Sequence, residues 1–345
     1  MKTGIITIIS RNYGNRLQNF ALQRVLEKKN IKVRTVPINN YYSIKIFIKF
    51  IIKKVLWKNT VWEEFEFKIK YAYQSCKKIN INQYDFFIAG SDQIWNPYFH
   101  FNSEREFLYF AEDNQKLVYA ASIGVERVSD KYCEKYSKLM NQIKYISVRE
   151  ESAALIVKKI TGRDVPVVLD PVMLLEKEEW LNFVKRSRWA CDKKYIFKYF
   201  LGGGNQEYDA YIEDIRKKGD YEVVDILGEK NKKYSCIGPK EFVSIISGAD
   251  IVCTDSFHAT VFSIIFSVPF ITFGRTAEEG YGDMMPRLVS LLDKFELRER
   301  LIMNTRQLLL EDLLKCDFFK AQKILLSERK NSLQYLDEAL GEKYE

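Results

Sequence analysis

The sequence predicts an α/β protein of two domains, each built on a mostly parallel sheet covered by helices. Short apolar runs alternate along the chain with longer segments in which apolar residues recur at helical spacing, and this alternation is typical of parallel sheets. The chain has 345 residues, which is more than one hydrophobic core usually organises. Hydrophobic residues make up 47% of it, which provides enough apolar surface for two cores.

The first half of the chain begins with a strand, a turn, a helix and a second strand. Apolar residues between positions 17 and 26 recur on one face of a helix, so this stretch reads as a βαβ unit. Strands are expected at residues 5–9, 32–38, 86–89, 117–123, 145–148 and 165–169. The strand at 145–148 leads into the helical stretch EESAALIVKK.

The pattern loosens after Asp170 and Pro171 and then restarts with a new strand, which places the domain boundary near residues 175–190. The two domains are therefore predicted as residues 1–180 and 181–345. In the second domain, strands are expected at 195–200, 222–226, 250–254 and 270–273, with helices at 207–218, 240–247 and 259–266. The last helices, from about 306 to 340, are expected to close this domain, with a crossing back to the first domain left open.

The composition excludes several classes of protein. The net charge is +8, and no dense block of lysine and arginine is interleaved with aromatic residues, so no nucleic-acid partner is expected. No apolar stretch approaches the roughly 20 residues that span a bilayer. The six cysteines form no CxxC pair, which argues against a zinc site or a redox couple. We expect a cytoplasmic enzyme that handles anionic substrates.

Basic residues concentrate in the segment SIKIFIKFIIKKVLWK, residues 43–58. Its apolar residues recur at helical spacing, and lysines fill most of the remaining positions. One interpretation is an amphipathic helix docked on its own domain. The other is a helix that lies on the inner face of a membrane, as basic helices with a strongly apolar face can.

The first of three polar turns is SRNYGNRLQ, residues 10–18, between a strand and a helix. Asn12, Gly14 and Asn15 suit turn conformations that point backbone N–H groups at a ligand, and a helix N-terminus favours an anion. Gln18 ends this stretch. The turn lacks the Lys-Ser/Thr ending of a phosphate-binding loop, so ordinary helix capping is an equal alternative.

The second polar turn is AGSDQIWNP, residues 89–97, in which a buried strand ends and Ser91, Asp92 and Gln93 follow. Asp92 either binds a sugar hydroxyl or caps the turn. The amide of Gln93 beside the aromatic ring of Trp95 suits a sugar ring, which favours contact with a ligand.

The third polar turn lies in IVCTDSFHATVFSIIFSVPF, where a buried strand gives way to an apolar helix. Asp255 and Ser256 form the turn, and His258 stands in the first turn of the helix. The chain has two histidines, and the other, His100, lies in an aromatic loop where packing is the simpler role. We interpret His258 as catalytic because imidazole suits proton transfer near neutral pH. The helix N-terminus should disfavour imidazolium, and Asp255 should favour it.

Three arginines follow or flank apolar elements and are candidates for holding an anion. Arg149 follows the strand YISV, Arg275 follows ITFG, and Arg287 lies in MPRLVSLL. A guanidinium group binds phosphate and carboxylate in fork geometry, so arginines that converge on one site would suit a small polyanion.

Five blocks, taken in this order, resemble the polysaccharide pyruvyl transferase family: NYGNRLQNFAL, YDFFIAGSDQIWNP, YISVREESAALI, VVLDPVMLL and TDSFHATVFSIIFSVPF. The resemblance covers most of the chain, and five ordered blocks are more specific than any single one. It implies two Rossmann-like halves similar to GT-B glycosyltransferases. It also implies transfer of pyruvate from phosphoenolpyruvate to a sugar, or to a lipid-linked oligosaccharide, as a ketal.

The resemblance implies roles for particular residues. His258 matches the family's catalytic histidine, with Asp255 beside it. Many members carry an arginine two residues before this histidine, where this chain has Ser256. The donor is therefore expected to be held by Arg149, Ser256, Arg275 and Arg287. The acceptor is expected to contact Asn12, Gly14, Asn15, Gln18, Ser91, Asp92, Gln93 and Trp95. No cofactor and no metal are needed.

Two other functions stay open from the sequence. A glycosyltransferase of the same two-domain shape would bind a nucleotide diphosphate, and the LGGGN turn at residues 201–205 either cradles that ligand or is only a tight turn. A catalytically silent partner in a glycan-assembly complex is the third reading, motivated by Ser256 where many members have arginine.

Overall fold

The computed structural model describes residues 1–37, 52, 61–66, 68–72, 74–99, 104–185, 187, 189–202, 205–228, 237–275, 285–303 and 308–341. Apart from residue 52, the segment 43–58 lies outside this part of the chain, as does His100, so the membrane interpretation stays a prediction. None of the helices in the described ranges is long and apolar enough to cross a membrane.

The described residues divide into two compact units. Unit 1 comprises those of 1–174 and 328–341, and unit 2 comprises those of 175–275 and 285–327. Helix α13 (Phe319–Gly341) contributes its first part to unit 2 and its last part to unit 1.

Unit 1 is built on five parallel strands in the order β2-β1-β3-β4-β5. These strands are β1 (Lys2–Ile6), β2 (Lys32–Thr35), β3 (Phe86–Gly90), β4 (Lys116–Ala121) and β5 (Tyr145–Val148). The helices are α1 (Tyr13–Lys28), α3 (Val61–Glu66), α4 (Asp130–Met140), α5 (Glu151–Thr161) and α6 (Pro171–Leu174). Short 3₁₀ turns occur at Ile81–Gln83, Glu104–Phe107 and Asp113–Gln115.

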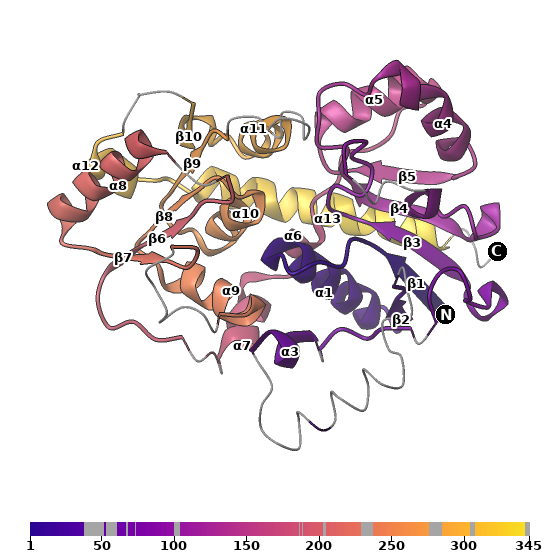
Figure 1. Ribbon diagram of the computed structural model, residues 1–345, viewed down its shortest axis with the longest axis horizontal. Helices are drawn as coiled ribbons and strands as arrows, with labels where there is room; N and C mark the ends of the chain where they lie inside the picture. The colour runs from indigo at the N-terminus through magenta and orange to yellow at the C-terminus, as the bar shows by residue number, and fades with distance from the viewer. Residues whose placement is uncertain are drawn as a thin grey trace. The chain divides into compact units, whose positions relative to one another are not determined.

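Helices cover both faces of this sheet, which is why its central strand β3 is buried at every position. On one face, Phe87 shares a core with Met140 of α4 and Ile156 of α5, the two helices that lie together beside β5 (Figure 1). On the other face, α1 approaches closely: a Cβ atom on Gly90 would stand 2.7 Å from Cδ2 of Leu22. A side chain at position 90 would therefore force the Leu22 side chain of α1 to move.

Unit 2 is built on five parallel strands in the order β10-β9-β8-β6-β7. These strands are β6 (Tyr195–Tyr199), β7 (Glu222–Asp225), β8 (Ile251–Thr254), β9 (Phe270–Phe273) and β10 (Leu301–Ile302). The helices are α7 (Lys177–Val184), α8 (Gln206–Gly219), α9 (Pro239–Gly248), α10 (Phe257–Phe266), α11 (Met285–Lys294) and α12 (Leu310–Leu314), with a 3₁₀ turn at Arg298–Arg300.

Successive residues of β6 face opposite layers of unit 2, as strand geometry requires. Ile196 shares a core with Tyr211 and Ile215 of α8. The ring of the next residue, Phe197, lies 5.9 Å from the ring of Phe242 on α9. Helices therefore cover both faces of this sheet as well, and the predicted fold class of parallel sheets covered by helices is confirmed.

Three details differ from the predicted elements. The first strand is Lys2–Ile6 rather than 5–9, because its residues pair with β2 on one side and β3 on the other. Residues 165–169 make only the single bridge between Val148 and Val167, since Pro166 has no N–H to donate to a ladder. The short edge strand β10 was not predicted, because two residues carry no periodic pattern.

Both sheets share one topology. Numbered within its own unit, each has the strand order 2-1-3-4-5. In sheets of this order, ligands bind beyond the carboxyl ends of the strands, at the point between the first and third strands where the order reverses. In unit 1 the predicted turns 10–18 and 89–97 stand at that point, after β1 and β3. In unit 2 the corresponding residues are Leu201 after β6 and Asp255 after β8.

We expect Cys253 of β8 to resist alkylation in the folded protein. Its side chain is fully buried, and burial raises the pKa of its thiol from 9.0 to about 12. Only the thiolate reacts, so at pH 8 its reactive fraction is about 10⁻⁴. Iodoacetamide at pH 8 followed by peptide mapping should modify the half-buried Cys191 long before Cys253. Denaturant should remove the difference, and equal labelling of both in native protein would contradict the prediction.

The same raised pKa sets a window for stability. The neutral thiol of Cys253 is compatible with its buried site at all pH values below 9.0, and its contribution to folding is lost as the pH rises from there toward about 12. A change of pH near neutrality therefore does not alter the contribution of this thiol to stability.

Candidate functional site

Helix α1 begins at an asparagine cap after β1. The side-chain oxygen of Asn12 accepts from the backbone N–H of Asn15 at 3.1 Å, and the Asn15 oxygen accepts from the N–H of Ser10 at 3.1 Å. The Asn15 amide nitrogen donates to Oδ2 of Asp92 at 3.0 Å. Gly14 is buried in the first turn of this helix. The cap therefore ties α1 to the turn that follows β3.

Gln18 lies fully buried beneath this cap. Its Nε2 donates to Oγ1 of Thr7 at 2.8 Å and to the carbonyl of Asn15 at 3.0 Å. The Thr7 hydroxyl in turn lies 3.5 Å from the carbonyl of Ser91. Gln18 thus links the end of β1 to the end of β3 through Thr7, and its expected contact with the acceptor stays a prediction.

The turn after β3 has a strained backbone. Ser91 has φ 22° and Asp92 has φ 64°, both in the left-handed region that side-chain-bearing residues rarely adopt. Each such residue costs about 1 kcal/mol or more, and strain of this kind concentrates at functional sites. Backbone hydrogen bonds hold it: Ser91 donates to Tyr119 at 2.9 Å, and Ser122 donates to Asp92 at 3.0 Å.

Arg149 follows β5 and lies beneath that turn, with a side chain 2% exposed. Its Nη1 stands 2.7 Å from Oδ2 of Asp170, its Nη2 3.9 Å from Oδ1 of Asp92, and its Nε 3.8 Å from Oε2 of Glu150. Burial alone would lower the pKa of Arg149, but the three carboxylates outweigh it and raise that pKa. The structure makes Arg149 a buried counter-ion, and its expected contact with the donor stays a prediction.

Gln93 and Trp95 use their side chains within unit 1. The Gln93 oxygen accepts from Nδ2 of Asn96 at 2.8 Å. Trp95 is 0% exposed, its indole N–H donates to the carbonyl of Glu106 at 3.1 Å, and its ring stacks on Phe107 at 5.2 Å. The ring of Trp95 therefore belongs to the core of unit 1, and its expected contact with a sugar stays a prediction.

In unit 2, Asp255 anchors two loops. Its Oδ1 accepts from the N–H of Leu201 at 2.7 Å, and its Oδ2 accepts from the N–H of Gly202 at 2.7 Å and from Nε of Arg275 at 3.0 Å. A Cβ atom on Gly202 would stand 3.0 Å from Oδ2 of Asp255, so this loop requires glycine to approach the carboxylate. Both oxygens of Asp255 serve the loops after β6 and β9. Asp255 therefore has a structural role in these loops, and its expected action as a partner of His258 stays a prediction.

Ser256 and His258 begin α10. Ser256 caps the helix, with its hydroxyl oxygen accepting from the N–H of Ala259 at 3.5 Å. Its own N–H donates to Oγ1 of Thr254 at 3.0 Å. His258 is 6% exposed, and the edge of its ring meets the ring of Phe257 at 5.3 Å. The imidazole therefore lies almost buried just beyond the carboxyl end of β8, in the first turn of α10.

Arg275 and Arg287 both contact residues of the segment 255–258. Arg275 is bonded to Asp255, and its side chain remains 17% exposed. The guanidinium of Arg287, from the first turn of α11, stands over the ring of Phe257 at 5.9 Å. The backbone N–H of Arg275 also donates to the sulfur of Met285 at 3.4 Å, which links the end of β9 to α11. Two cations are thus placed around the turn that carries His258.

The structure brings the predicted residues together within each unit. In unit 1, the cluster of Asn15, Asp92 and Arg149 gains two members that the sequence analysis did not propose, Asp170 and Glu150. The Glu150 carboxylate accepts from Ser122 and from two backbone N–H groups. The signal for Asp170 was its place in the block VVLDPVMLL, directly before a proline. No group of three or more possible metal ligands occurs among the described residues.

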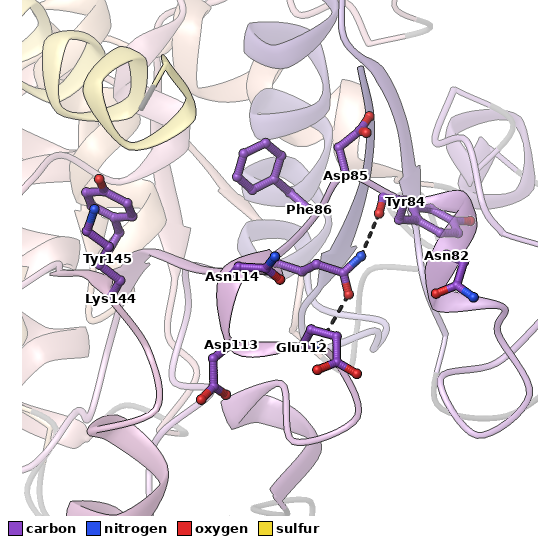
Figure 2. A pocket seen from close by; sticks show the side chains of 10 residues that line it. Asn82, Tyr84, Asp85, Phe86, Glu112, Asp113, Asn114, Lys144 and Tyr145 are labelled. Atoms are coloured by element: carbon purple, nitrogen blue, oxygen red, sulfur yellow. Dashed lines mark hydrogen bonds between the residues drawn. The ribbon is translucent and has the colours of Figure 1, made fainter. Parts of the chain in front are cut away.

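Two hollows lie at the opposite end of the unit 1 sheet. The larger, of about 670 Å³, opens at the amino ends of β3, β4 and β5 (Figure 2). Within it the Gln115 amide is bonded to backbone groups of Tyr84 and Glu112, at 2.7 and 3.3 Å. The smaller, of about 430 Å³, lies beside the amino ends of β1 and β2. Neither contains a predicted site residue, and ligands of such sheets bind at the other end.

Comparisons with solved structures agree with the fold. The chain is 13% identical to the UDP-GlcNAc 2-epimerase from Neisseria meningitidis bound to UDP-GlcNAc, with a TM-score of 0.52 over 99% of this chain and 100% of that one. It is 14% identical to a putative UDP-N-acetylglucosamine 2-epimerase from Listeria monocytogenes, with a TM-score of 0.54 over 97% and 90%. At these identities the likeness shows the fold alone, and the expected GT-B-like pair of Rossmann-like units is confirmed.

Comparison of sequences gives two matches, one to a short stretch of the chain and one to most of its length. A stretch of 64 residues, 19% of this chain, is 30% identical to 83% of the membrane-associated ATPase epsilon chain of Sulfolobus acidocaldarius. The long match is to the family model described as polysaccharide pyruvyl transferase, over residues 12–276. It spans the first polar turn from residue 12 onward, the whole of the other two, including His258, and most of the described parts of both units. The chain belongs to the polysaccharide pyruvyl transferase family.

Proposed function

We propose that this protein transfers pyruvate from phosphoenolpyruvate to two hydroxyl groups of one sugar, in a surface polysaccharide or its lipid-linked precursor, and forms a ketal. The observation that carries the proposal is the charge balance at the matching points of the two sheets. In unit 2, two guanidinium groups face one carboxylate around His258. In unit 1, the guanidinium of Arg149 faces three carboxylates, and that of Arg16 is paired with Glu66.

The donor belongs on unit 2 by this argument. Phosphoenolpyruvate carries a phosphate and a carboxylate, so it is attracted by an excess of positive charge and by helix N-termini. Arg275 keeps part of its surface exposed while it is bonded to Asp255, and Arg287 stands over Phe257. The N-terminus of α10 adds its positive end. These groups supply the positive charge that, in many relatives, comes from an arginine at the position of Ser256.

The acceptor belongs on unit 1. The buried carboxylates of this unit disfavour a polyanion, but carboxylate and amide oxygens suit the hydroxyl groups of a sugar. Asp92 has a side chain 15% exposed, more than its ion-pair partner Arg149 at 2%. Asn12 and Ser10 stand at the adjacent loop after β1. We therefore assign acceptor contact to Asp92 and Asn12, since the Ser91 side chain is fully buried and bonded to Asp170.

The reaction needs one proton donor to carbon. Protonation of the methylene carbon of phosphoenolpyruvate makes the adjacent carbon electrophilic, and a sugar hydroxyl then adds to it and gives up its proton. Attack by a second hydroxyl breaks the bond to phosphate, which leaves with the second proton. The products are the ketal and inorganic phosphate. His258 is the group that we assign to proton transfer, with Arg275 and Arg287 stabilising the phosphate as it leaves.

The two alternatives find less support. A glycosyltransferase that cradled a diphosphate in the LGGGN turn would need its backbone N–H groups, but those of Leu201 and Gly202 are bonded to Asp255. A catalytically silent role was motivated by Ser256, and the arginines that contact the segment 255–258 offer another source of positive charge.

Purified protein should release inorganic phosphate from phosphoenolpyruvate only when an acceptor glycan is present. The assay measures phosphate against a panel of bacterial surface glycans and lipid-linked precursors, and mass spectrometry should find one added pyruvate ketal per acceptor site. Nucleotide sugars serve as the control donors. Consumption of a nucleotide sugar, with no phosphate released from phosphoenolpyruvate, would replace this proposal with the glycosyltransferase.

A further inference from the structure

We propose that the Arg149–Asp170 ion pair is a positioning device: it holds the strained Ser91–Asp92 turn so that the Asp92 carboxylate stays aimed beyond the carboxyl end of β3, ready for the acceptor hydroxyl. The inference rests on the proposed function, because it takes Asp92 as the acceptor contact. Asp170 and Arg149 themselves touch no substrate.

The pair lies wholly inside unit 1. The side chains of Arg149 and Asp170 are 2% and 0% exposed, and the atoms that join them are 2.7 Å apart. The second oxygen of Asp170 accepts from the N–H of Val172 at 3.0 Å, which fixes the carboxylate at the start of α6. A buried ion pair contributes little net stability. Its role here is therefore the fixed geometry that it imposes on its neighbours.

The pair reaches the turn through three contacts, one of which is the donation from Nη1 of Arg149 to the hydroxyl oxygen of Ser91 at 3.5 Å. The hydroxyl of Ser91 donates to Oδ2 of Asp170 at 2.9 Å. The guanidinium of Arg149 stands 3.9 Å from the carboxylate of Asp92. These contacts grip the two consecutive residues that have positive φ angles. A left-handed pair without glycine persists only where its surroundings over-determine it, and the ion pair supplies that constraint from below.

Of the two turn residues, Asp92 is the one whose side chain is partly exposed. Two further donors orient its carboxylate, the N–H of Gln93 at 2.9 Å and the amide of Asn15 at 3.0 Å. The Asp92 side chain is 15% exposed, and it is the most exposed charged group of this described cluster. These donors fix the direction of the carboxylate, and its exposed part is the surface that a sugar hydroxyl would meet. The buried ion pair therefore acts on the acceptor through Asp92.

The test compares Arg149→Lys and Asp170→Asn with the wild type in the phosphate-release assay. A lysine cannot span Asp170 and Asp92 in fork geometry, so kcat/KM for the acceptor should fall at least about tenfold. The KM for phosphoenolpyruvate should stay within about twofold. Arg163→Lys is the matched control, because Arg163 of the same unit donates to the carbonyls of Met140, Ile143 and Lys144. That control should leave both constants unchanged.

A double mutant that combines changes at Arg149 and Asp92 distinguishes a positioning role of Arg149 from a general disturbance of the fold. Asparagine tolerates a left-handed backbone, so Asp92→Asn should lower acceptor kcat/KM without moving the turn. Added to Asp92→Asn, Arg149→Lys should cause less than about one third of the loss it causes alone, because both act on one contact. Full additivity, or a tenfold rise in the KM for phosphoenolpyruvate with the acceptor constants unchanged, would overturn the inference and make Arg149 a donor ligand.

A second readout needs no activity, so it distinguishes failure of the inference from failure of the proposed function. Amide hydrogen exchange in residues 91–96 should be at least about tenfold faster in Asp170→Asn, with exchange in α10 of unit 2 unchanged. If Asp170→Asn does not fold, Ser91→Ala removes the contacts of the Ser91 hydroxyl with Asp170 and Arg149, leaves the ion pair itself in place, and should show the same local increase. Wild-type exchange in these variants would overturn the inference even if the enzyme proves active.

Discussion

Replacing His258 with alanine is expected to lower the rate of phosphate release, at saturating phosphoenolpyruvate and acceptor, by about 100-fold or more. The reason is the loss of the group assigned to proton transfer at the methylene carbon. The binding groups Arg275 and Arg287 remain, so the KM for phosphoenolpyruvate should change little. Steady-state phosphate release by the variant, beside wild type, measures the effect.

Ser263→Ala is the matched control for this variant. Ser263 lies on the same helix and is fully buried, and its hydroxyl donates to the carbonyl of Ala259 at 2.9 Å. Its removal also truncates a buried polar side chain of α10, but it should leave the rate within about twofold. If His258→Ala works at the wild-type rate, the proton donor is another group and the mechanism proposed for unit 2 is wrong.

Replacing Asp255 with alanine is expected to lower the free energy of unfolding of unit 2 by about 3–5 kcal/mol, because breaking a buried ion pair leaves its partner uncompensated. The Asp255 side chain is 3% exposed, and it holds Arg275 together with the N–H groups of Leu201 and Gly202. Hydrogen exchange in β8 and α10 under rising denaturant reports this unit by itself, which avoids assuming one transition for the whole chain.

An exposed ion pair provides the contrast. Asp214 and Lys218 are joined at 2.6 Å, with side chains 47% and 55% exposed. Asp214→Asn should change the free energy of unfolding by less than about 1 kcal/mol, since exposed pairs are screened by water and salt. Similar stability of Asp255→Ala and Asp214→Asn would show that the carboxylate of Asp255 does not anchor its loops.

These two experiments separate the roles of neighbouring residues. The His258 variant should lose rate and keep its stability within the range of a small core truncation. The Asp255 variant should lose stability first, and any loss of rate should follow from displaced loops. The sequence placed both residues in one catalytic group because they stand in one turn. The hydrogen bonds of Asp255 give it a structural role that His258 does not share.

The alternation of strands and helices was readable from the sequence because the period of apolar residues is a local property. The strands β5 and β9 lie at the residues predicted for them. The turns at 10–18, 89–97 and 255–258 were found for the same reason, since each lies where a buried strand ends and polar residues begin. Strand ends shifted by a few residues where pairing, rather than hydrophobicity, decides the limit.

The roles of individual side chains depended on contacts between distant parts of the chain. Trp95 reads as an exposed aromatic beside a polar turn, but Phe107 and Glu106 enclose it in the folded unit. Arg149 reads as a cation after a strand, but Asp170 meets it from another loop.

By itself, the sequence determined the family, the parallel α/β architecture and the turns at the carboxyl ends of the strands, because each depends on residues close together in the chain. The tertiary structure alone decided which residues of those turns are anchors and which keep surface for a ligand. The physical reason is burial: a charged group must find a partner when it leaves water, and that partner is chosen by how the strands pair rather than by the order of residues.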